Sequence, residues 1–270
     1  MNFIDTIEAC WEKKNSLLCV GLDSDLEKIP SHLLKRDNPL FEFNKEIVDA
    51  TADLVCAYKP QIAFYAASKS EDELEMTIEY IHDRYPDVPV ILDAKRGDIG
   101  STAKMYAKEV FDRFKADAVT VNPYLGFDTL KPFLEREEKG VIILCRTSNP
   151  GAKDIQDLET NGKKIYQIIA RMAVDSWNYN GNIILVVGAT YPRELHEIRS
   201  IVGEMPFLVP GIGAQGGDVE KAVMNGKNEK GTGMIINSSR GIIYAGDGND
   251  FAQAARNAAI QLRDEINRYR

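Results

Sequence analysis

The stretch Val88-Pro-Val-Ile-Leu-Asp93-Ala-Lys95-Arg-Gly-Asp98-Ile-Gly-Ser-Thr102 begins as a short apolar run and ends in alternating acidic and basic side chains. This pattern predicts a buried strand that opens into a charged loop. Asp93 and Lys95 are two residues apart, so on a strand their side chains point to the same face, and Asp98 follows within reach of the Lys95 ammonium. Burying such charges costs desolvation energy that a solvated loop would avoid. The alternative is a helix N-terminus that Asp98 caps, with Lys95 merely exposed.

Eight short apolar runs recur along the chain, and helical patterns separate most of them. The predicted strands are 17–23, 54–60, 88–93, 118–122, 141–148, 183–188, 207–210 and 234–237. Such alternation implies parallel pairing, and eight units in a chain of 270 residues favour an α/β fold with one closed (β/α)8 barrel, a TIM barrel, as a single domain over 1–270. A doubly wound sheet is the alternative, which is disfavoured because no Gly-x-Gly-x-x-Gly turn follows the first strand.

Helical spacing of apolar residues occurs between these runs. The predicted helices are 3–11, 71–84, 101–114, 129–138, 165–177, 192–202 and 250–270. The first of them is amphipathic, and we expect it to cover one end of the barrel. The segment 24–48 is polar, contains Pro30 and Pro39, and becomes helical only toward Ile47. It is therefore predicted to be a long connecting segment before the second strand.

The chain is acidic, with a net charge of -8 and a pI near 5.1. This charge argues against broad nucleic-acid binding and leaves any anionic ligand to a few local groups. No apolar run approaches the length of a membrane-spanning helix, and the first residues lack the basic and then apolar pattern of an export signal. We therefore expect a cytoplasmic protein that binds neither nucleic acid nor membranes.

Neither the cysteines nor the histidines have the spacing of a metal site. The residues are Cys10, Cys19, Cys56 and Cys145, and His32, His82 and His196. Three of the cysteines fall inside apolar strand candidates, so we expect reduced core residues. The histidines are scattered, and we expect them at the surface. No Ser-His-Asp or Cys-His arrangement of a nucleophilic enzyme emerges.

Charged side chains gather where the predicted strands end. Asp23 follows the first strand, Lys59 lies near the end of the second, and the third ends in Asp93, Lys95 and Asp98. Because the carboxyl ends of the strands carry the active site in barrels of this type, these five residues predict one. For Lys59 alone, the alternative is a side chain that extends past the strand into solvent.

The last two strands are followed by loops that suit a phosphate group. The loop after the seventh strand is Gly211-Ile-Gly-Ala-Gln215-Gly-Gly217-Asp218, and the eighth strand runs into Asn237-Ser-Ser-Arg240-Gly241. Small residues let backbone N–H groups approach an anion, and an arginine can clamp it. Glycines alone mark any tight turn, so the prediction rests on the glycines and Arg240 together.

The pattern Asp93-x-Lys95-x-x-Asp98-Ile99 followed by Thr102 resembles the signature of the orotidine 5'-phosphate decarboxylase family, in its longer, second subgroup. The resemblance extends over nearly the whole chain, with the segment 24–48 and the insertion 226–233 departing from the short form. It implies that Lys59, Asp93, Lys95 and Asp98 form the catalytic charged network. It further assigns ribose contact to Asp23, pyrimidine recognition to Ser148, a bridge between base and phosphate to Gln215, and the phosphate to Arg240.

The resemblance also implies the reaction, which converts orotidine 5'-phosphate to uridine 5'-monophosphate (UMP) and CO2 without a metal or an organic cofactor. Lys95 then stabilises the negative charge that develops on the pyrimidine ring and gives its proton to the carbon. The family forms a homodimer with shared active sites, so Asp98 and Thr102 are expected to reach into the neighbouring subunit's site.

Two other functions compete with this one. Metal-dependent sugar-phosphate lyases and epimerases on related barrels share the Asp-x-Lys-x-x-Asp pattern, but they carry a magnesium-binding acid where this chain has Lys59, and a lysine would repel the cation. A non-catalytic nucleotide-binding barrel would keep the phosphate loops and lose the charges. All four network residues are present, which counts against it.

Overall fold

The protein is described here by a computed structural model that covers residues 2–212 and 217–270. Within these ranges eight parallel strands form one sheet, in the order β2-β1-β10-β9-β8-β5-β4-β3. The strands are β1 Leu18–Leu22, β2 Ala57–Pro60, β3 Ile91–Arg96, β4 Ala118–Val121, β5 Gly140–Arg146, β8 Ile183–Val187, β9 Phe207–Val209 and β10 Met234–Ser238. Bridges from Tyr58 to Val90 and from Gln61 to Asp93 join the two edge strands, so the barrel is nearly closed. The predicted barrel is confirmed.

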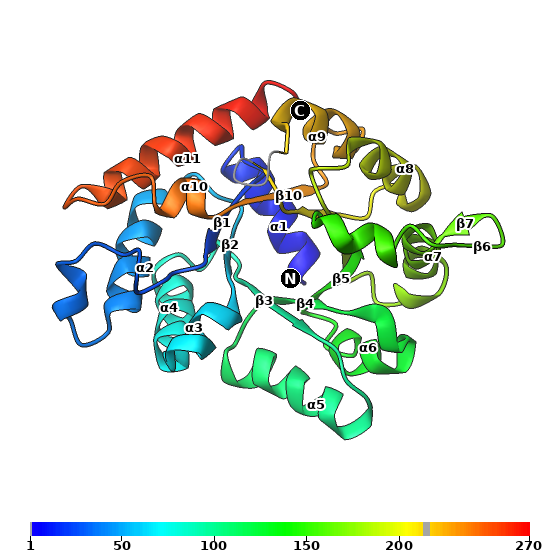
Figure 1. Ribbon diagram of the computed structural model, residues 1–270, viewed down its shortest axis with the longest axis horizontal. Coiled ribbons are helices and arrows are strands. Elements are labelled where there is room, and N and C mark those ends of the chain that lie inside the picture. Colours follow the sequence, from blue (N-terminus) through cyan, green and yellow to red (C-terminus); the bar gives the residue numbers. More distant parts are fainter. Residues whose placement is uncertain (1, 213–216) are drawn as a thin grey trace.

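Helices surround the strands, as Figure 1 shows. They are α1 Phe3–Lys13, α2 Pro39–Thr51, α3 Ile62–Ser68, α4 Glu71–Arg84, α5 Gly100–Lys108, α6 Phe127–Leu134, α7 Ile165–Met172, α8 Pro192–Val202, α9 Val219–Gly226, α10 Arg240–Ile243 and α11 Phe251–Asn267. A two-stranded hairpin, β6 Glu159–Thr160 and β7 Lys163–Lys164, projects beside α7. Within the described ranges, no helix has both the length and the apolar composition needed to cross a membrane.

Helix α1 lies at the end of the barrel where the strands begin. The Phe3 backbone N–H donates to Glu138 O, just before β5, and the Phe3 ring packs so closely on Gly140 that a side chain there would collide with it. Cys10 Sγ donates to Asp87 O, in the segment before β3. The opposite end of the barrel, where the strands end, therefore stays open for a site.

The predicted elements differ from the structure in several places. The segment 24–48 is less extended than expected, because α2 already begins at Pro39, a residue that suits the first turn of a helix. Strand β2 begins only at Ala57, and the helix expected over 129–138 is α6, which ends at Leu134. The pattern missed α3, α9 and α10, all of eight residues or fewer, which are too short to show helical periodicity clearly.

The cysteines and histidines lie largely as expected. All four cysteines are buried free thiols, and burial raises the pKa of Cys10 to about 11 and that of Cys19 to about 12. His32 and His196 are exposed. His82 is partly exposed, and its Nε2 lies 2.9 Å from Asp117 Oδ2, just before β4.

Candidate active site

A cavity of about 490 Å³ opens at the carboxyl ends of the strands. Five of the predicted site residues line it, namely Asp23, Lys59, Asp93, Lys95 and Ser148. Sequence reasoning missed its other polar lining residues, which are Gln61, Thr120, Thr147, Asn149, Gln156 and Asn237. These six carry no charge, so nothing in the strand-end charge pattern singled them out. The remaining lining is apolar, as in most small-molecule sites.

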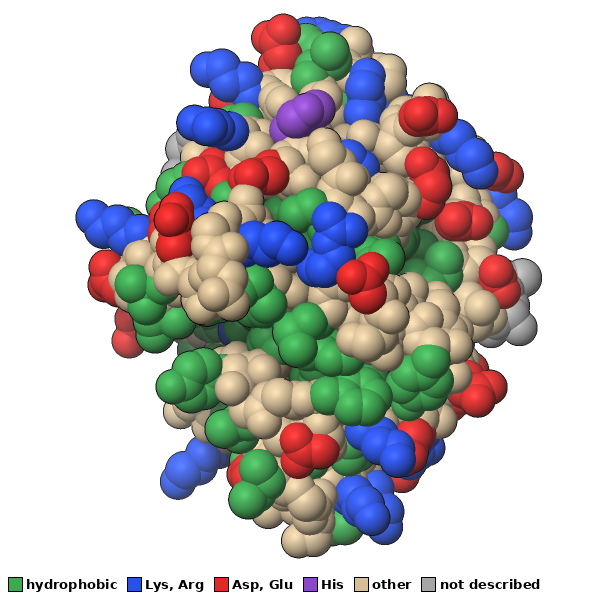
Figure 2. Space-filling view, turned by 90° about the vertical axis from the view of Figure 1, so that its right-hand side faces the viewer, with side chains coloured by type: hydrophobic (Ala, Val, Ile, Leu, Met, Phe, Trp, Pro, Cys, Tyr) green, Lys and Arg blue, Asp and Glu red, His purple; other side chains and the backbone are tan. Residues whose placement is uncertain are grey.

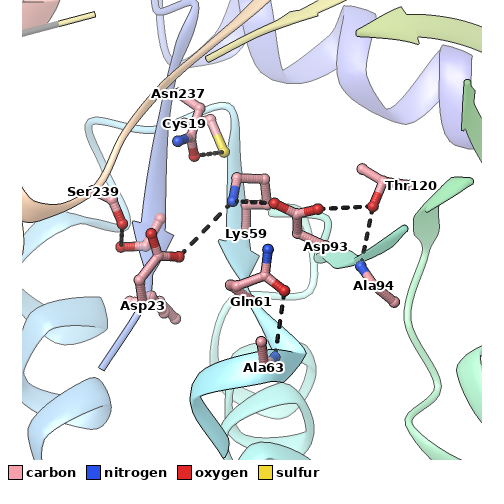
Figure 3. Close-up of polar contacts among 12 residues, drawn as sticks. Cys19, Asp23, Lys59, Gln61, Ala63, Asp93, Ala94, Thr120, Asn237 and Ser239 are labelled. Atoms are coloured by element: carbon pink, nitrogen blue, oxygen red, sulfur yellow. Dashed lines mark hydrogen bonds and ion pairs between the residues drawn. The ribbon is translucent and has the colours of Figure 1, made fainter. Parts of the chain in front are cut away.

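Lys59, Asp93 and Lys95 form a continuous ion-pair chain in this cavity. Lys59 Nζ lies 3.1 Å from Asp93 Oδ2, and Lys95 Nζ lies 2.6 Å from Asp93 Oδ1, so each carboxylate oxygen faces one ammonium. Figure 3 shows Lys59 and Asp93 pointing toward each other from adjacent strands. Lys59 is only 4% exposed, so the alternative of a lysine that extends into solvent is wrong.

An irregularity at the end of β3 directs these side chains. The pairing of β3 with β4 shifts register between Leu92 and Arg96, and Lys95 has a φ of 45°. Thr120, on β4, accepts hydrogen bonds from the backbone N–H groups of Ala94 and Lys95 and donates one to Asp93 Oδ1. A left-handed lysine is strained by about 1 kcal/mol or more, and such strain is typical of functional sites. Thr120 holds the strained turn and the carboxylate together.

The charges of the chain stabilise one another. Burial alone would raise the pKa of Asp93, but the ammonium groups of Lys59 and Lys95 and hydrogen bonds from Lys95 and Thr120 hold this pKa below its usual range. Burial alone would lower the pKa of Lys59, whereas the carboxylates of Asp93 and Asp23 raise it above its usual value. Both groups are therefore charged at neutral pH.

Asp23 lies on the other side of Lys59. Its Oδ1 is 3.9 Å from Lys59 Nζ, which is too far for a hydrogen bond, and this buried oxygen accepts none from a described residue. A buried carboxylate oxygen with no donor is costly, so the position suits a ligand that brings a hydroxyl group. The register that pairs Gly21 with Lys59 brings the ends of β1 and β2 together here.

Asp98 and Thr102 do not line this cavity. The structure shows no ion pair between Asp98 and the Lys95 ammonium within the described ranges, where Asp98 Oδ1 accepts from the Ile99 N–H. The capping alternative is wrong, since Ile99 occupies the N-cap of α5 without a side-chain cap. Thr102 is exposed on α5.

The loop that carries Ser148 is braced by a buried arginine. Arg146 is 1% exposed, its Nη1 donates to Thr147 O, and its Nε lies 3.2 Å from Asp157 Oδ1. Gln156 accepts from the Thr147 N–H and donates to Thr147 Oγ1. Gly188 leaves the room that Ser148 needs, because a Cβ there would lie 2.8 Å from the Ser148 backbone. These contacts hold Ser148 at the cavity edge.

Of the two proposed phosphate residues, Arg240 is described by the structure and does not line the cavity. Gln215 lies outside the described residues. Arg240 begins α10 and is exposed, three residues after Asn237, which lines the cavity. Its guanidinium makes no ion pair with any residue in the described ranges, so its charge is available to an anion. Across residues 2–212 and 217–270, no three His, Cys, Asp or Glu side chains are grouped to hold a metal ion.

The chain matches known proteins over most or all of its length. A model of the orotidine 5'-phosphate decarboxylase / HUMPS family matches residues 16–255. The orotidine 5'-phosphate decarboxylases of Dechloromonas aromatica and Ralstonia nicotianae are 60% and 58% identical to this chain, over the whole of both chains in each case.

Solved structures agree. The orotidine monophosphate decarboxylase of Leishmania donovani is 37% identical, with a TM-score of 0.87, and the match covers 100% of this chain and 99% of that one. The UMP synthase of the same organism is 39% identical, with a TM-score of 0.89, and the match covers 100% of this chain and 56% of that longer one. The strand-end charges, the barrel and these full-length matches together show that the chain belongs to the orotidine 5'-phosphate decarboxylase family.

Proposed function

We propose that the Lys59–Asp93–Lys95 chain is the catalytic centre with which this protein converts orotidine 5'-phosphate to UMP and CO2, the last step of de novo pyrimidine nucleotide synthesis. The observation that carries the proposal is the pair of ammonium groups held 3.1 and 2.6 Å from one buried carboxylate at the mouth of the barrel. No organic cofactor or metal ion takes part in the proposed reaction.

Loss of CO2 breaks the bond between the pyrimidine ring and its carboxylate and leaves the electron pair on the ring carbon, where conjugation cannot spread it. The barrier must therefore fall through fixed electrostatics and proton supply. Lys95 supplies both, because its ammonium faces the cavity and can give a proton to that carbon. Asp93 fixes the position of Lys95, and its negative charge would repel the nearby substrate carboxylate. Lys59 keeps Asp93 ionised.

The ribose, pyrimidine and phosphate of the substrate are assigned to the polar side chains that suit each of them. We assign the ribose hydroxyl groups to Asp23, whose buried oxygen has no donor among the described residues, and the pyrimidine to Ser148. Arg240 and Gln215 bind the phosphate in this proposal, and binding energy from that remote group helps to close the site and exclude water.

Lys59 also separates this function from that of the metal-dependent barrels. Its ammonium lies between Asp93 and Asp23, at 3.1 and 3.9 Å, and supplies the positive charge that a divalent cation would otherwise provide to two carboxylates. A second cation at this point would be repelled by Lys59. This arrangement favours the decarboxylase over a magnesium-dependent lyase or epimerase.

We further propose a homodimer whose subunits complete each other's sites. Large apolar side chains are exposed on the segments around α5, α6 and α7, and Figure 2 shows hydrophobic side chains gathered on the middle and lower part of this side of the molecule. The exposed large apolar residues on these segments are Ile99, Met105, Tyr124, Leu125, Phe127, Met172, Val174 and Tyr179. Apolar side chains that gather on one side of a molecule suit an interface, and we propose a second copy of the chain as the partner.

The residues proposed to cross between subunits lie beside this patch. Asp98 precedes Ile99, which is 61% exposed, and Thr102 is exposed on the first turn of α5. Neither lines the cavity of its own chain. We also propose a cytoplasmic location, which the four free buried cysteines support because thiols persist in a reducing compartment.

The direct test is release of CO2 from carboxyl-labelled orotidine 5'-phosphate by protein treated with a chelator and dialysed. We expect stoichiometric CO2 and UMP, with no change when Mg²⁺ is added back. Activity that depends on added Mg²⁺ would favour a metal-dependent lyase or epimerase. Binding of UMP without any CO2 release would favour a non-catalytic nucleotide-binding barrel.

A further inference from the structure

The contact between β1 and β10 continues beyond the end of their backbone ladder. Backbone pairing ends with Val20 opposite Ser238. One residue further, Ser239 Oγ donates to Gly21 O at 3.0 Å, a bond that Figure 3 shows. The approach is so close that a Cβ at Gly21 would lie 2.5 Å from Ser239 Oγ. Side chains therefore take over where the strand ladder stops.

A second side chain from the same segment holds the next part of β1. The Tyr244 hydroxyl, directly after α10, donates to Asp23 O at 3.0 Å and accepts from the Asp25 N–H at 2.8 Å. It thus bridges the backbone on both sides of Ser24. The Tyr244 ring stacks on Phe43 of α2, with centroids 5.8 Å apart and an angle of 20° between the planes. This packing fixes the direction from which the hydroxyl reaches Asp23.

Arg240 lies between these two anchors in the chain. Ser239 precedes it, Tyr244 follows the single turn of α10, and the Tyr244 N–H donates to Arg240 O at 3.3 Å. The short helix that begins with Arg240 is therefore tied on one side to Gly21 of β1 and on the other to Asp23, the residue directly after β1. A shift of α10 must move Asp23 or break these hydrogen bonds.

The position of Asp23 matters to the catalytic cluster. Its carboxylate is 3.9 Å from Lys59 Nζ, and Lys59 holds Asp93. Asp23 N–H and C=O groups lie beyond the β1–β10 ladder, so Tyr244 supplies the restraint on this side. Tyr65, from α3, restrains the other side through a hydrogen bond from its hydroxyl to Leu22 O at 3.0 Å.

We propose that Ser239 and Tyr244 are positioning residues. Their two hydrogen bonds to Gly21 O and Asp23 O, here called the clamp, couple the contact between Arg240 and the phosphate to the position of Asp23. The clamp thereby holds Asp23 against the ribose and Lys59. The inference rests on the proposed function, because it takes Arg240 as the phosphate residue and Asp23 as the ribose residue. Neither Ser239 nor Tyr244 touches the reacting atoms in this account.

The test is a double-mutant cycle on UMP binding, measured by calorimetry with Tyr244→Phe, Arg240→Ala and the double variant. Tyr244→Phe loses both hydrogen bonds of the hydroxyl and keeps the stacked ring, so we expect UMP affinity to fall about tenfold in the wild-type background. In the Arg240→Ala background, the same change should lower UMP affinity by less than about twofold, because no contact between Arg240 and the phosphate remains for the clamp to couple to Asp23.

Tyr65→Phe is the matched control. It removes a hydroxyl that bonds the same end of β1 but comes from α3, so its effect on UMP affinity should be the same in both backgrounds. Ser239→Ala removes the other anchor and should repeat the Tyr244→Phe pattern with a smaller loss of about threefold, which keeps the test available if Tyr244→Phe folds poorly.

Equal losses from Tyr244→Phe with and without Arg240 would overturn the clamp, because they would mean that Tyr244 only supports the structure of the loop. Turnover of the wild-type protein is measured in parallel. Additive losses in a protein that decarboxylates orotidine 5'-phosphate overturn the clamp alone, whereas coupled losses in a protein without turnover overturn the proposed reaction and support the clamp.

Discussion

Replacing Lys59 by methionine removes the cation that lies between the buried carboxylate of Asp93 and the partly exposed carboxylate of Asp23, while keeping an unbranched side chain of similar length. At an effective dielectric constant of about 20, unit charges at the observed 3.1 and 3.9 Å attract each other by about 5 and about 4 kcal/mol. Desolvation of the lysine offsets much of this attraction. Removing one partner of a buried ion pair therefore costs a net of about 3–5 kcal/mol of folding free energy, which we expect for Lys59→Met.

Urea unfolding at pH 7, followed by circular dichroism, measures this loss. The double variant Lys59→Met/Asp93→Asn is the control, because Asn removes the nearer and more deeply buried of the two negative charges and leaves only the partly exposed Asp23 beside the methionine. We expect the double variant to recover about 2 kcal/mol relative to Lys59→Met alone, although both variants should lack turnover. A loss below about 1 kcal/mol for Lys59→Met, or no recovery in the double variant, would refute the view that Lys59 acts by neutralising buried carboxylates.

Three further predictions concern the phosphate, the dimer and the pH dependence. Arg240→Ala should weaken binding of UMP by about 2 kcal/mol while leaving uridine, which lacks the phosphate, nearly unchanged, and equal losses for both ligands in calorimetry would mean a structural role. Lys95→Ala and Asp98→Ala should each be nearly inactive, but refolding them together should restore about a quarter of wild-type sites, whereas an inactive mixture with confirmed mixed dimers would reject the shared site. Folding lowers the pKa of Asp93, so its ionised form stabilises the protein at pH values above the ordinary carboxyl pKa of about 3.9. This stabilisation is lost as the pH falls through the lower pKa that Asp93 has in the folded state. The stability difference between wild type and Asp93→Asn should thus be constant from about pH 5 to 9 and shrink below about pH 4, and a difference that grows on acidification would contradict the assigned charge.

The barrel could be predicted because its strands are short apolar runs that alternate with helical patterns, and the first three of them end in charges. Each of the eight strands overlaps its predicted range, and Asp23, Lys59, Asp93 and Lys95 meet because parallel strands bring their carboxyl ends to one side. This convergence follows from topology alone and needs no detail of packing.

Other features depend on tertiary contacts that no local pattern encodes. Thr120 organises the β3 turn from the neighbouring strand, and Arg146 is buried only because Asp157 and Tyr191 come from later parts of the chain to pair and stack with it. Asp98 follows the strand end closely in sequence but does not line the cavity, which charge spacing alone could not foresee. Short helices such as α9 follow from the need to connect strands rather than from periodicity.

Turnover of Lys95→Ala tests the central claim most directly. The Lys95 side chain is 47% exposed, and within the described ranges it forms an ion pair only with Asp93, so its loss should leave the fold and UMP binding largely intact. We expect CO2 release from orotidine 5'-phosphate to fall by about 10³-fold or more, because the group that stabilises the developing charge and supplies the proton is gone. Turnover within about tenfold of wild type, in a variant that still binds UMP, would contradict the assignment of Lys95 as the proton donor.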